Sequence, residues 1–255
     1  MIQSVARAAS LLRELAGDTP RLGVTELAER VSLAKGTVHG LLRTLEAEGL
    51  VQQDPETGKY QLGMALFQLG STVLENHPLR ARSLFWADAL ANRTRQSSRV
   101  GVQYGDHVIV VHHVFRPDDT VQILEVGASI PWHACALGKA VVAHLEPAER
   151  DRLLAGPHEP LTGSTLTGPG ELAEELRRTA AAGVAGESQE AIVGESGLAA
   201  PVFDSSGRVA GALGITGPAD RFDVDVTDLQ VAVRECARGL SRDLGARRRP
   251  AASAD

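Results

Sequence analysis

Hydrophobic positions in the first fifty residues recur every three or four places, which is the spacing of one face of an α-helix. The pattern predicts a helix over residues 5–16, a second helix that begins near Thr25, and a third over about residues 35–48. Thr25 can cap the second helix. A turn of only three residues separates the second helix from the third. Two helices joined in this way are typical of a helix-turn-helix, which we place at about residues 23–42.

The pattern then changes to the two-residue period of β-strands. Residues 50–53 and 59–62 are strand-like, and the sequence between them, Asp54-Pro55-Glu56-Thr57-Gly58, favours a turn. A hairpin directly after a helix-turn-helix makes it winged, so we expect a first domain over residues 1–62. The same spacing also fits a small helical domain with no role in DNA binding. The pattern alone therefore leaves both interpretations open.

Helical spacing resumes at residue 63 and continues to about residue 96, with an interruption at Pro78. We interpret residues 63–78 as a linker helix and the rest as the first helix of a second domain. The linker contains a high density of apolar side chains, which favours a packed interface over a free tether; these are Met64, Leu66, Phe67, Leu69, Val73 and Leu74.

Strand-like and helical segments alternate from residue 79 to residue 246, which we take as the second domain. Gly105-Asp106 and Ser205-Ser206-Gly207 are hairpin turns between strand-like runs. The predicted strands cover residues 98–104, 107–114, 121–126, 199–204 and 209–216, and the helices 136–145, 147–154, 170–182 and 226–245, the last capped by Asp225 or Thr227. Hairpins without parallel crossovers predict an antiparallel sheet with helices packed on it, so the fold class is α+β. We expect residues 247–255 to be a disordered tail.

The composition fits an ordinary globular protein of two domains, with 255 residues, 43% hydrophobic and 23% charged. A net charge of −6 argues against a surface that is positive throughout, as some nucleic-acid-binding proteins have. Counting charges along the chain changes this picture, because residues 1–70 carry only −1 of that total and residues 71–255 carry −5. The excess of acid therefore belongs mainly to the second domain.

Several classes of protein are disfavoured. No apolar run approaches the roughly 18–20 residues needed to cross a bilayer, and the first residues lack the basic and apolar regions of a signal peptide. The two cysteines, Cys135 and Cys236, are too few for a disulfide scaffold or for a four-cysteine zinc site. We therefore expect a cytoplasmic protein.

The predicted third helix is the candidate for contact with DNA. Between residues 30 and 45 every charged side chain is basic. Phosphate attraction is local, since charges beyond a Debye length of about 8 Å are largely screened, so a short basic stretch is sufficient. A helix that enters the major groove also needs short polar side chains for base edges. The candidate DNA-binding residues are Arg30, Lys35, Thr37, His39, Arg43, Thr44 and, in the predicted hairpin, Lys59.

Other residues that could carry chemistry have more ordinary interpretations. His112 and His113 fall on opposite faces of a strand, which favours a structural or surface role over a shared metal. His133 with Cys135 supplies only two ligands, too few for zinc. Glu187 with Glu190 could be a pair of catalytic carboxylates, although an acidic pair in a loop is more often solvated. With no nucleotide-binding or hydrolase motif present, we expect no enzymatic activity, no bound metal and no cofactor.

The chain resembles the IclR family of transcriptional regulators over nearly its whole length, up to about residue 245. The segments that carry the resemblance are Glu26-Leu27-Ala28, Leu33-Ala34-Lys35-Gly36-Thr37-Val38-His39, Gly58-Lys59-Tyr60-Gln61-Leu62-Gly63, Pro131-Trp132-His133-Ala134-Cys135-Ala136-Leu137-Gly138-Lys139 and Gly214-Ile215-Thr216-Gly217-Pro218. The resemblance implies a winged helix-turn-helix, a GAF-like effector-binding domain, and a dimer or a dimer of dimers that binds double-stranded operator DNA. The chain departs from the family at Gly36 and Gly40, where most members have Ser and Arg, so its operator should differ from the common one.

The resemblance also implies where a small-molecule effector binds. The matching positions are Ala136, Leu137, Glu187, Gly197, Gly214 and Thr216, to which we add Lys139, either as a phosphate anchor or as part of a structural salt bridge. Relatives often have larger residues at Gly197 and Gly214, so we expect an enlarged cavity. Within the family the chain is most similar to actinobacterial regulators of glycerol operons, which implies a repressor released by glycerol or glycerol 3-phosphate. A phosphate close to Glu187 would be repelled by several kcal/mol (about 4 at an effective dielectric of ~20).

Two alternatives stay open. The first is an IclR-type regulator, including an activator, that senses a small carboxylic acid. The second, from another class, is an enzyme or metabolite-binding protein in which the helical N-terminal segment serves only for oligomerisation. Only the first of these predicts DNA binding that depends on salt.

Overall fold

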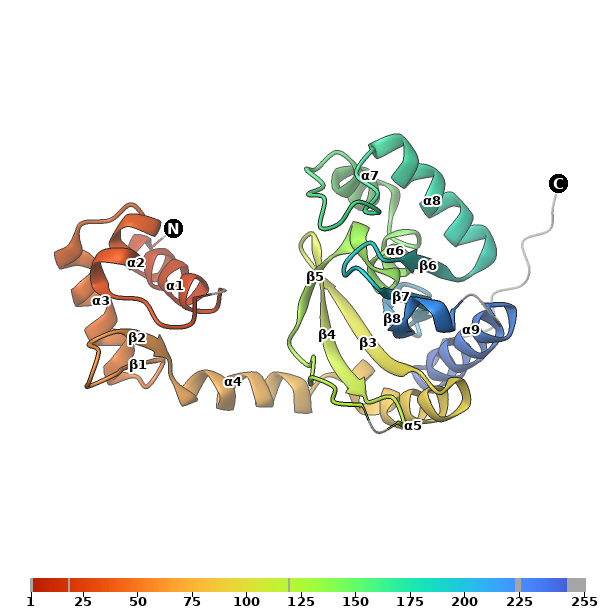
Figure 1. The fold of residues 1–255 in the computed structure, drawn as a ribbon, viewed down its shortest axis with the longest axis horizontal. Coiled ribbons are helices and arrows are strands. Elements are labelled where there is room, and N and C mark those ends of the chain that lie inside the picture. Colours follow the sequence, from red (N-terminus) through yellow and green to blue (C-terminus); the bar gives the residue numbers. More distant parts are fainter. Residues whose placement is uncertain (1, 18, 119, 223–225, 247–255) are drawn as a thin grey trace. The chain divides into compact units, whose positions relative to one another are not determined.

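The computed structural model describes residues 2–17, 19–118, 120–222 and 226–246. Its contacts divide the chain into two units, Met1–Asn76 and His77–Asp255. Figure 1 shows the first as a small helical body that continues into α4, and the second as a curved sheet with helices on both faces. The α+β prediction is thereby confirmed.

The first unit is a winged helix-turn-helix followed by a helix. Its elements are α1 (Gln3–Leu15), α2 (Val24–Arg30), α3 (Lys35–Ala47), β1 (Val51–Gln53), β2 (Tyr60–Leu62) and α4 (Met64–Glu75). Leucines from the three first helices meet in one core, which Val51 and Tyr60 of the antiparallel hairpin close. Thr25 is not the cap of α2, since the helix begins one residue earlier and the backbone N–H of Gly23 donates to the Glu26 carboxylate instead.

The hairpin leads into α4 through a close crossing of backbones. Gly63 donates its N–H to the carbonyl of Leu50, and a Cβ on Gly63 would lie 2.1 Å from the carbonyl oxygen of Gly49. No larger residue fits at this position without moving the chain. The start of α4 is therefore fixed by the end of the wing.

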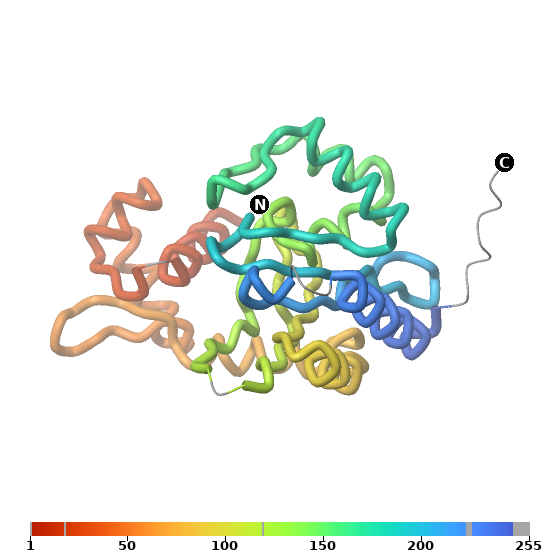
Figure 2. The backbone as a smooth tube through the Cα atoms, turned by 45° about the vertical axis from the view of Figure 1, so that its right-hand side comes forward, coloured from red at the N-terminus to blue at the C-terminus, as the bar shows by residue number. Residues whose placement is uncertain are grey.

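The second unit contains a six-stranded antiparallel sheet with the order β5-β4-β3-β8-β7-β6. The strands are β3 (Ser97–Tyr104), β4 (His107–Val114), β5 (Ser129–Pro131), β6 (Ala185–Ser188), β7 (Glu195–Phe203) and β8 (Val209–Pro218). Helices α5 (Pro78–Thr94) and α9 (Val226–Asp243) pack on one face, and α6 (Ala136–Val142), α7 (Pro147–Leu154) and α8 (Pro169–Ala182) lie over the other. Figure 2 shows these two helical layers on either side of the sheet.

Two parts of the strand prediction were wrong. Residues 121–126 form no strand, although their composition is apolar; Val121 and Ile123 are 99% and 81% exposed, so nothing packs on them to hold an extended pairing. Strands β5 and β6 were missed, because each has only three or four residues and exists through pairing with β4 and β7. Thr227 lies inside α9, while Asp225 and the predicted tail at residues 247–255 fall outside the described residues.

No helix in the described part of the chain is long and apolar enough to span a bilayer.

Candidate functional site

Helix α3 buries one face in the core of the first unit and exposes the other. Val38, Leu42 and Leu45 point inward. Lys35, His39 and Arg43 are exposed and spaced four residues apart, so they line the opposite face. Neither Lys35 nor Arg43 forms an ion pair with another described residue. The two cations are therefore unpaired in the described part of the chain, although the exposed Glu46 follows Arg43 by three residues near the end of the helix.

Two glycines lie on the same exposed side of α3. A Cβ added at Gly36 or Gly40 would meet no atom within 4 Å, so packing inside the unit does not require glycine at either position. Thr37 is exposed, and the Thr44 hydroxyl donates to the carbonyl of Gly40 at 3.1 Å. The exposed face therefore has no side chain at Gly36 and Gly40, between its basic residues. Another backbone can approach the helix closely at these two positions.

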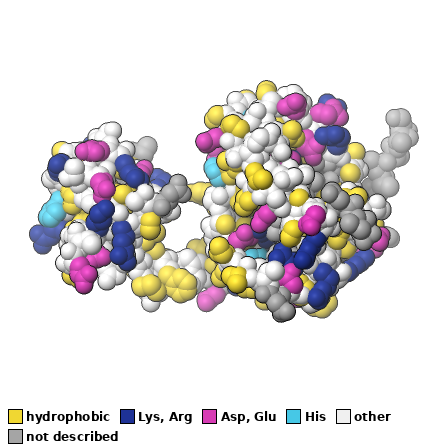
Figure 3. All heavy atoms as spheres, in the orientation of Figure 1, with side chains coloured by type: hydrophobic (Ala, Val, Ile, Leu, Met, Phe, Trp, Pro, Cys, Tyr) yellow, Lys and Arg dark blue, Asp and Glu magenta, His cyan; other side chains and the backbone are white. Residues whose placement is uncertain are grey.

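The other two predicted DNA-binding cations are paired with acids. Arg30 lies 3.6 Å from Glu14, and Lys59 lies 3.5 Å from Glu26, with all four side chains at least a third exposed. Exposed pairs of this kind contribute only about 0–1 kcal/mol, so a phosphate can replace the carboxylate at little cost. Basic side chains and a histidine are visible on the surface of the first unit in Figure 3.

In the second unit, three of the predicted effector residues are directly opposite one another on neighbouring strands. Thr216 of β8 pairs with Gly197 of β7, and Gly197 pairs with Glu187 of β6. Residues opposite one another share a face, and here it is the face that α6 covers, since Ala199 and Ala212, in the same alternation, pack against α6. The Thr216 hydroxyl donates to the carbonyl of Ser196 at 3.2 Å.

Glu187 leans over Gly197, because one of its carboxyl oxygens would lie 3.3 Å from a Cβ at that glycine. The pKa of Glu187 is raised to about 7, mainly by burial and in part by the nearby Glu190 carboxylate, although the backbone N–H of Glu190, which donates to it at 3.2 Å, acts in the opposite direction. Close to neutral pH, a large fraction of Glu187 is thus uncharged. The repulsion of a phosphate that the sequence suggested is weaker for this reason.

Lys139 lies in the structural salt bridge that the sequence left open as its second interpretation. Its ammonium donates to Glu190 at 2.5 Å and to the carbonyl of Gly186 at 3.3 Å, and its side chain is 1% exposed. Ala136 and Leu137, three and two residues before it, are buried under the sheet. As the ammonium is already neutralised, Lys139 has no free charge to offer a ligand in this arrangement.

The cation that the sequence reasoning missed is Arg99. It pairs with Gly214 across β3 and β8, which places it on the same face as Thr216 and Glu187, and its side chain is only 13% exposed. Its guanidinium holds the Glu125 carboxylate, with Nη2 donating to Oε1 at 2.6 Å, and lies 3.9 Å from Glu195. The available signal was a single charge within the predicted strand at 98–104, but its partner across the sheet could not be read from the sequence.

The expected enlargement of the cavity at the two glycines was wrong. A Cβ at Gly214 would lie 2.5 Å from the carbonyl of Leu198, and one at Gly197 would lie 3.0 Å from the carbonyl of Ile215. The neighbouring strands fill the space that larger side chains would take. Since Ala136, Leu137, Lys139 and Thr216 are also at most 6% exposed, the site is closed in this structure.

The histidines and Cys135 have structural environments. Burial lowers the pKa of His113 to about 4, and its Nδ1 accepts the backbone N–H of Glu125. His133 contacts the carbonyl of Glu159. Cys135 caps α6 by accepting the N–H of Gly138, and burial raises the pKa of its thiol to about 12, so the thiol is protonated and a poor nucleophile at neutral pH. Among the described residues, no group of three His, Cys, Asp or Glu could hold a metal ion.

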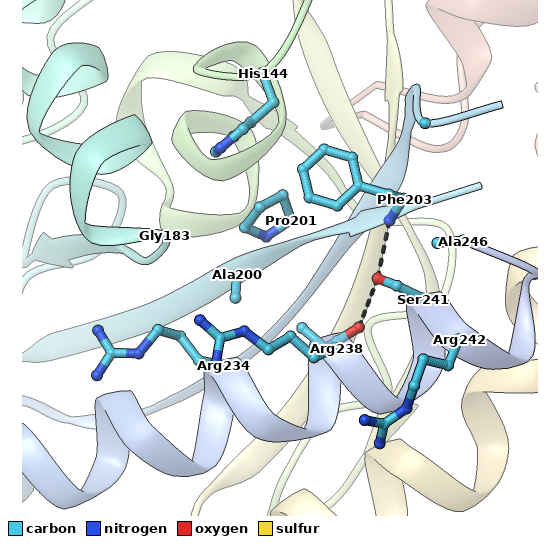
Figure 4. Close-up of a pocket in the computed structure, with 12 residues that line it drawn as sticks. His144, Gly183, Ala200, Pro201, Phe203, Arg234, Arg238, Ser241, Arg242 and Ala246 are labelled. Atoms are coloured by element: carbon cyan, nitrogen blue, oxygen red, sulfur yellow. Dashed lines mark hydrogen bonds between the residues drawn. The ribbon is translucent and has the colours of Figure 1, made fainter. Parts of the chain in front are cut away.

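A larger pocket lies away from all of these residues. It has a volume of about 670 Å³ and is bordered by α9 and the end of β7 (Figure 4). None of the predicted effector residues lines it. It is therefore a separate feature of the second unit.

The chain matches two protein-family models. Residues 4–55 match the IclR helix-turn-helix domain, and residues 71–242 match the C-terminal domain of bacterial transcriptional regulators of the IclR type. Together the two matches include both α3 and the residues of the closed site.

Proteins with similar sequences and structures agree with these matches. The glycerol operon regulatory proteins of Streptomyces griseus and Streptomyces coelicolor are 47% and 45% identical to the chain over 250 residues, which is 97% of this chain and 98% of each relative. A crystal structure of an IclR transcriptional regulator from Alicyclobacillus acidocaldarius has a TM-score of 0.83 at 28% identity, covering 96% of this chain and all of that one. An IclR homologue from Microbacterium hydrocarbonoxydans, crystallised with 4-hydroxybenzoate, has a TM-score of 0.78 at 24% identity, covering 94% of this chain and 98% of that one.

The raised pKa of Glu187 predicts a pH dependence of stability. Between pH 4.5 and about 7 the folded chain keeps a proton on Glu187 that the unfolded chain has lost, so stability falls as the pH rises through this window. Glu187→Gln removes the ionisation. At pH 5 the melting temperatures of the variant and the parent should therefore be similar. By pH 8 the melting temperature of the variant should have risen by several degrees relative to that of the parent, equivalent to at most about 3 kcal/mol.

Thermal unfolding of both proteins at one protein concentration and several pH values measures this difference. Glu174→Gln, an exposed acid on α8, is the matched control and should show no such trend. If the difference in melting temperature between Glu187→Gln and the parent stayed constant from pH 5 to pH 8, the raised pKa of Glu187 would be contradicted.

Proposed function

The chain belongs to the IclR family of DNA-binding transcriptional regulators, and from this premise we propose that α3 contacts operator DNA while a polyol ligand of the glycerol type binds at the closed site and controls that contact. The observation that supports the contact with DNA is that Lys35 and Arg43, both exposed on α3, form no ion pair with another described residue. The second half rests on the arrangement of Glu187, Thr216 and Arg99.

Helix α3 is proposed as the recognition helix. Lys35 and Arg43 would meet phosphate oxygens, and His39 and Thr37 are within the part of the helix that reaches base edges in helix-turn-helix complexes. The bare backbone at Gly36 and Gly40 allows the helix to sit deeper in the groove. Arg30 and Lys59 would exchange their exposed carboxylate partners for phosphates, and Thr44 adds a hydroxyl.

The proposed effector is glycerol or glycerol 3-phosphate. Support comes from the names of the two Streptomyces relatives, which are 45–47% identical to the chain, and from the chemistry of the site. The carboxyl of Glu187 accepts or donates a hydrogen bond according to its protonation, and the Thr216 hydroxyl does both, so the pair suits adjacent hydroxyl groups. Ala136, Leu137, Gly197 and Gly214 would form the walls around the ligand.

A phosphate on the ligand would be held by Arg99 and not by Lys139. The Lys139 ammonium already has a buried counter-charge in Glu190, whereas Arg99 is held by Glu125, which is 26% exposed and belongs to a segment outside the sheet. A phosphate offers the same bidentate geometry as a carboxylate and carries more charge. The phosphate would thus take the place of Glu125, and the segment that carries Glu125 would have to move.

Regulation requires the ligand to bind one arrangement of the protein more tightly than another. Release of Glu125 supplies such a difference, because in this arrangement that carboxylate occupies the guanidinium that would hold the ligand's phosphate. In a repressor, the liganded arrangement would bind operator less tightly. This would switch on genes for glycerol use when the ligand is present.

The regulator is further proposed to be a dimer that pairs through α4. This helix has no buried residue within the first unit, and Met64, Phe67, Leu69 and Val73 are 60–71% exposed. In Figure 3, hydrophobic side chains gather where Figure 1 places α4. So large an apolar surface on one helix is typical of a protein–protein interface. A second copy of the chain would cover it and would supply the second DNA-binding unit that a two-fold operator requires.

The DNA contact predicts a change in salt dependence. Replacing Arg43 with Ala should weaken binding to the DNA upstream of the protein's own gene by about tenfold, and should reduce the slope of log affinity against log salt by about 0.9 for each phosphate that is no longer neutralised. Fluorescence anisotropy at several salt concentrations measures both. Arg177→Ala, on α8, is the control with the same charge change. Unchanged affinity and slope in Arg43→Ala would exclude an interaction with DNA there.

The effector proposal predicts a selective loss in calorimetric titrations. The parent should bind glycerol 3-phosphate, and Arg99→Gln should weaken that binding by at least about tenfold while any binding of glycerol is kept. Arg93→Gln, whose arginine pairs with Glu235, is the charge-matched control. If neither compound gave heat on titration, a glycerol-type ligand would be refuted. Arg99-dependent binding of glycerate alone would favour the alternative of a carboxylic acid.

The dimer proposal predicts that Phe67→Glu shifts the protein towards monomer in sedimentation velocity, because a charge would enter the apolar interface. Gln68→Glu changes the charge of the neighbouring exposed position without removing apolar surface, and should leave the dimer intact. Equal association of both variants would place the interface elsewhere.

A further inference from the structure

The pocket of about 670 Å³ in the second unit is built from elements that the proposed function does not use. It lies between α9, the last residues of β7, the end of α8 at Gly183, and His144, which follows α6. Figure 4 shows the rings of His144 and Phe203 on one side of it and arginine side chains of α9 on the other. Its volume falls within the range of about 300–1,000 Å³ that small-molecule sites occupy.

Helix α9 separates its charges between two faces. On the face towards α5, Glu235 receives a hydrogen bond from Arg93, and Asp243 receives one from the indole of Trp86. On the face towards the pocket lie Arg234, Arg238 and Arg242, four residues apart along the helix. Glu235 and Asp243 are thus engaged with α5, and no ion pair joins either of them to these arginines in the described part of the chain. Of the described residues that line the pocket, none is acidic.

Arg234 and Arg238 form the cationic end of the pocket. Their side chains extend in the same direction along α9, whereas Arg242 points downward in this view, away from the other two (Figure 4). Arg234 uses one N–H to donate to the carbonyl of Ala182 at 3.2 Å, which fixes its guanidinium and leaves other N–H groups of the fork available. Two guanidinium groups presented side by side match the oxygens of a phosphate.

The remaining walls are apolar and partly aromatic. Phe203 meets the ring of His144 edge to face, with centroids 5.4 Å apart, and Pro201, Ala200 and Ala237 complete this side. The backbone N–H of Phe203 donates to the hydroxyl of Ser241, which in turn donates to the carbonyl of Ala237. These bonds tie the end of β7 to α9. The pocket is therefore held open by fixed elements.

The pocket is distinct from the closed site around Glu187. Gly197, in that site, and Phe203, in the pocket, are six residues apart on β7, which corresponds to about 20 Å along the strand. Arg99 and Thr216 do not line the pocket. A ligand could therefore occupy it independently of the effector.

We propose that this pocket binds an organic monophosphate whose remaining part is apolar or aromatic. The phosphate would lie against Arg234 and Arg238, and the apolar part against Phe203 and Pro201. Two arginines that extend the same way, with no acidic residue among the described lining residues, favour an anion of more than one charge. The apolar wall favours a ligand with a hydrophobic group over inorganic phosphate. The proposal depends on the pocket alone and would stand if the glycerol effector were refuted.

Calorimetric titration of the full-length protein with phenyl phosphate tests it, with inorganic phosphate and phenol as partial ligands. Phenyl phosphate should bind at least about tenfold more tightly than either part. Arg238→Gln should weaken this binding by about tenfold, and Arg234→Gln/Arg238→Gln should abolish it. Arg238 makes no hydrogen bond with another described residue, so the single variant tests the site even if the double variant folds poorly.

Arg177→Gln is the matched control and should bind phenyl phosphate like the parent. Arg99→Gln should also leave this binding unchanged, which separates the pocket from the proposed effector site. The proposal would be overturned if phenyl phosphate did not bind, or if inorganic phosphate bound with equal affinity. It would also be overturned if binding of phenyl phosphate were lost on replacing the arginines at 247–249 but not in Arg238→Gln.

Discussion

The buried ion pair between Lys139 and Glu190 holds together the face of the second unit that is proposed to bind the effector. Lys139 rises from α6 with no exposed surface and reaches the turn between β6 and β7, where the Glu190 carboxylate accepts a hydrogen bond from its ammonium. The same turn is anchored by Thr165, whose hydroxyl donates to the carbonyl of Glu190 at 2.6 Å. The N–H of Glu190 then fixes the Glu187 carboxyl over Gly197. Removing one partner of such a pair costs about 3–5 kcal/mol, so the position of Glu187 depends on it.

With Lys139 neutralised in this way, Arg99 and Glu125 determine the electrostatics of the site. Burial raises the pKa of Glu125 as well as that of Glu187, which means that both acids are held in surroundings that disfavour their charge. Because the Glu125 carboxylate is poorly solvated and is bound to the Arg99 guanidinium, an anionic ligand would compete with it for that guanidinium. The closed arrangement satisfies its own charges, and an anionic ligand would substitute for one of them without adding an unpaired charge.

The two units use charge in different ways. In the first, Lys35, His39 and Arg43 are exposed along α3, and the acid of that helix, Glu46, comes only near its end. In the second, α9 directs Glu235 and Asp243 towards α5 and three arginines towards a pocket. A net charge of −6 for the chain therefore says little about either surface. What decides binding is which side chains share a face within a Debye length of about 8 Å.

The sequence by itself determined the helices, the hairpin turns and the basic helix, since all of these are set by contacts between residues a few positions apart. Helical spacing at residues 35–48 was enough to place Val38 inside and Arg43 outside. The resemblance to a family placed Glu187, Gly197 and Thr216 in one site, and the structure brings these three together across adjacent strands. Only the tertiary structure decided that the Lys139 ammonium is paired with Glu190 and that Arg99 lies on the same face as the site, opposite Gly214. It also decided that residues 121–126 are not a strand and that neighbouring backbone fills the space beside Gly197 and Gly214. These depend on which strands pair and in which register, and the residues that meet, such as Lys139 with Glu190 or Arg99 with Gly214, are far apart in the sequence and carry no local mark of their partners.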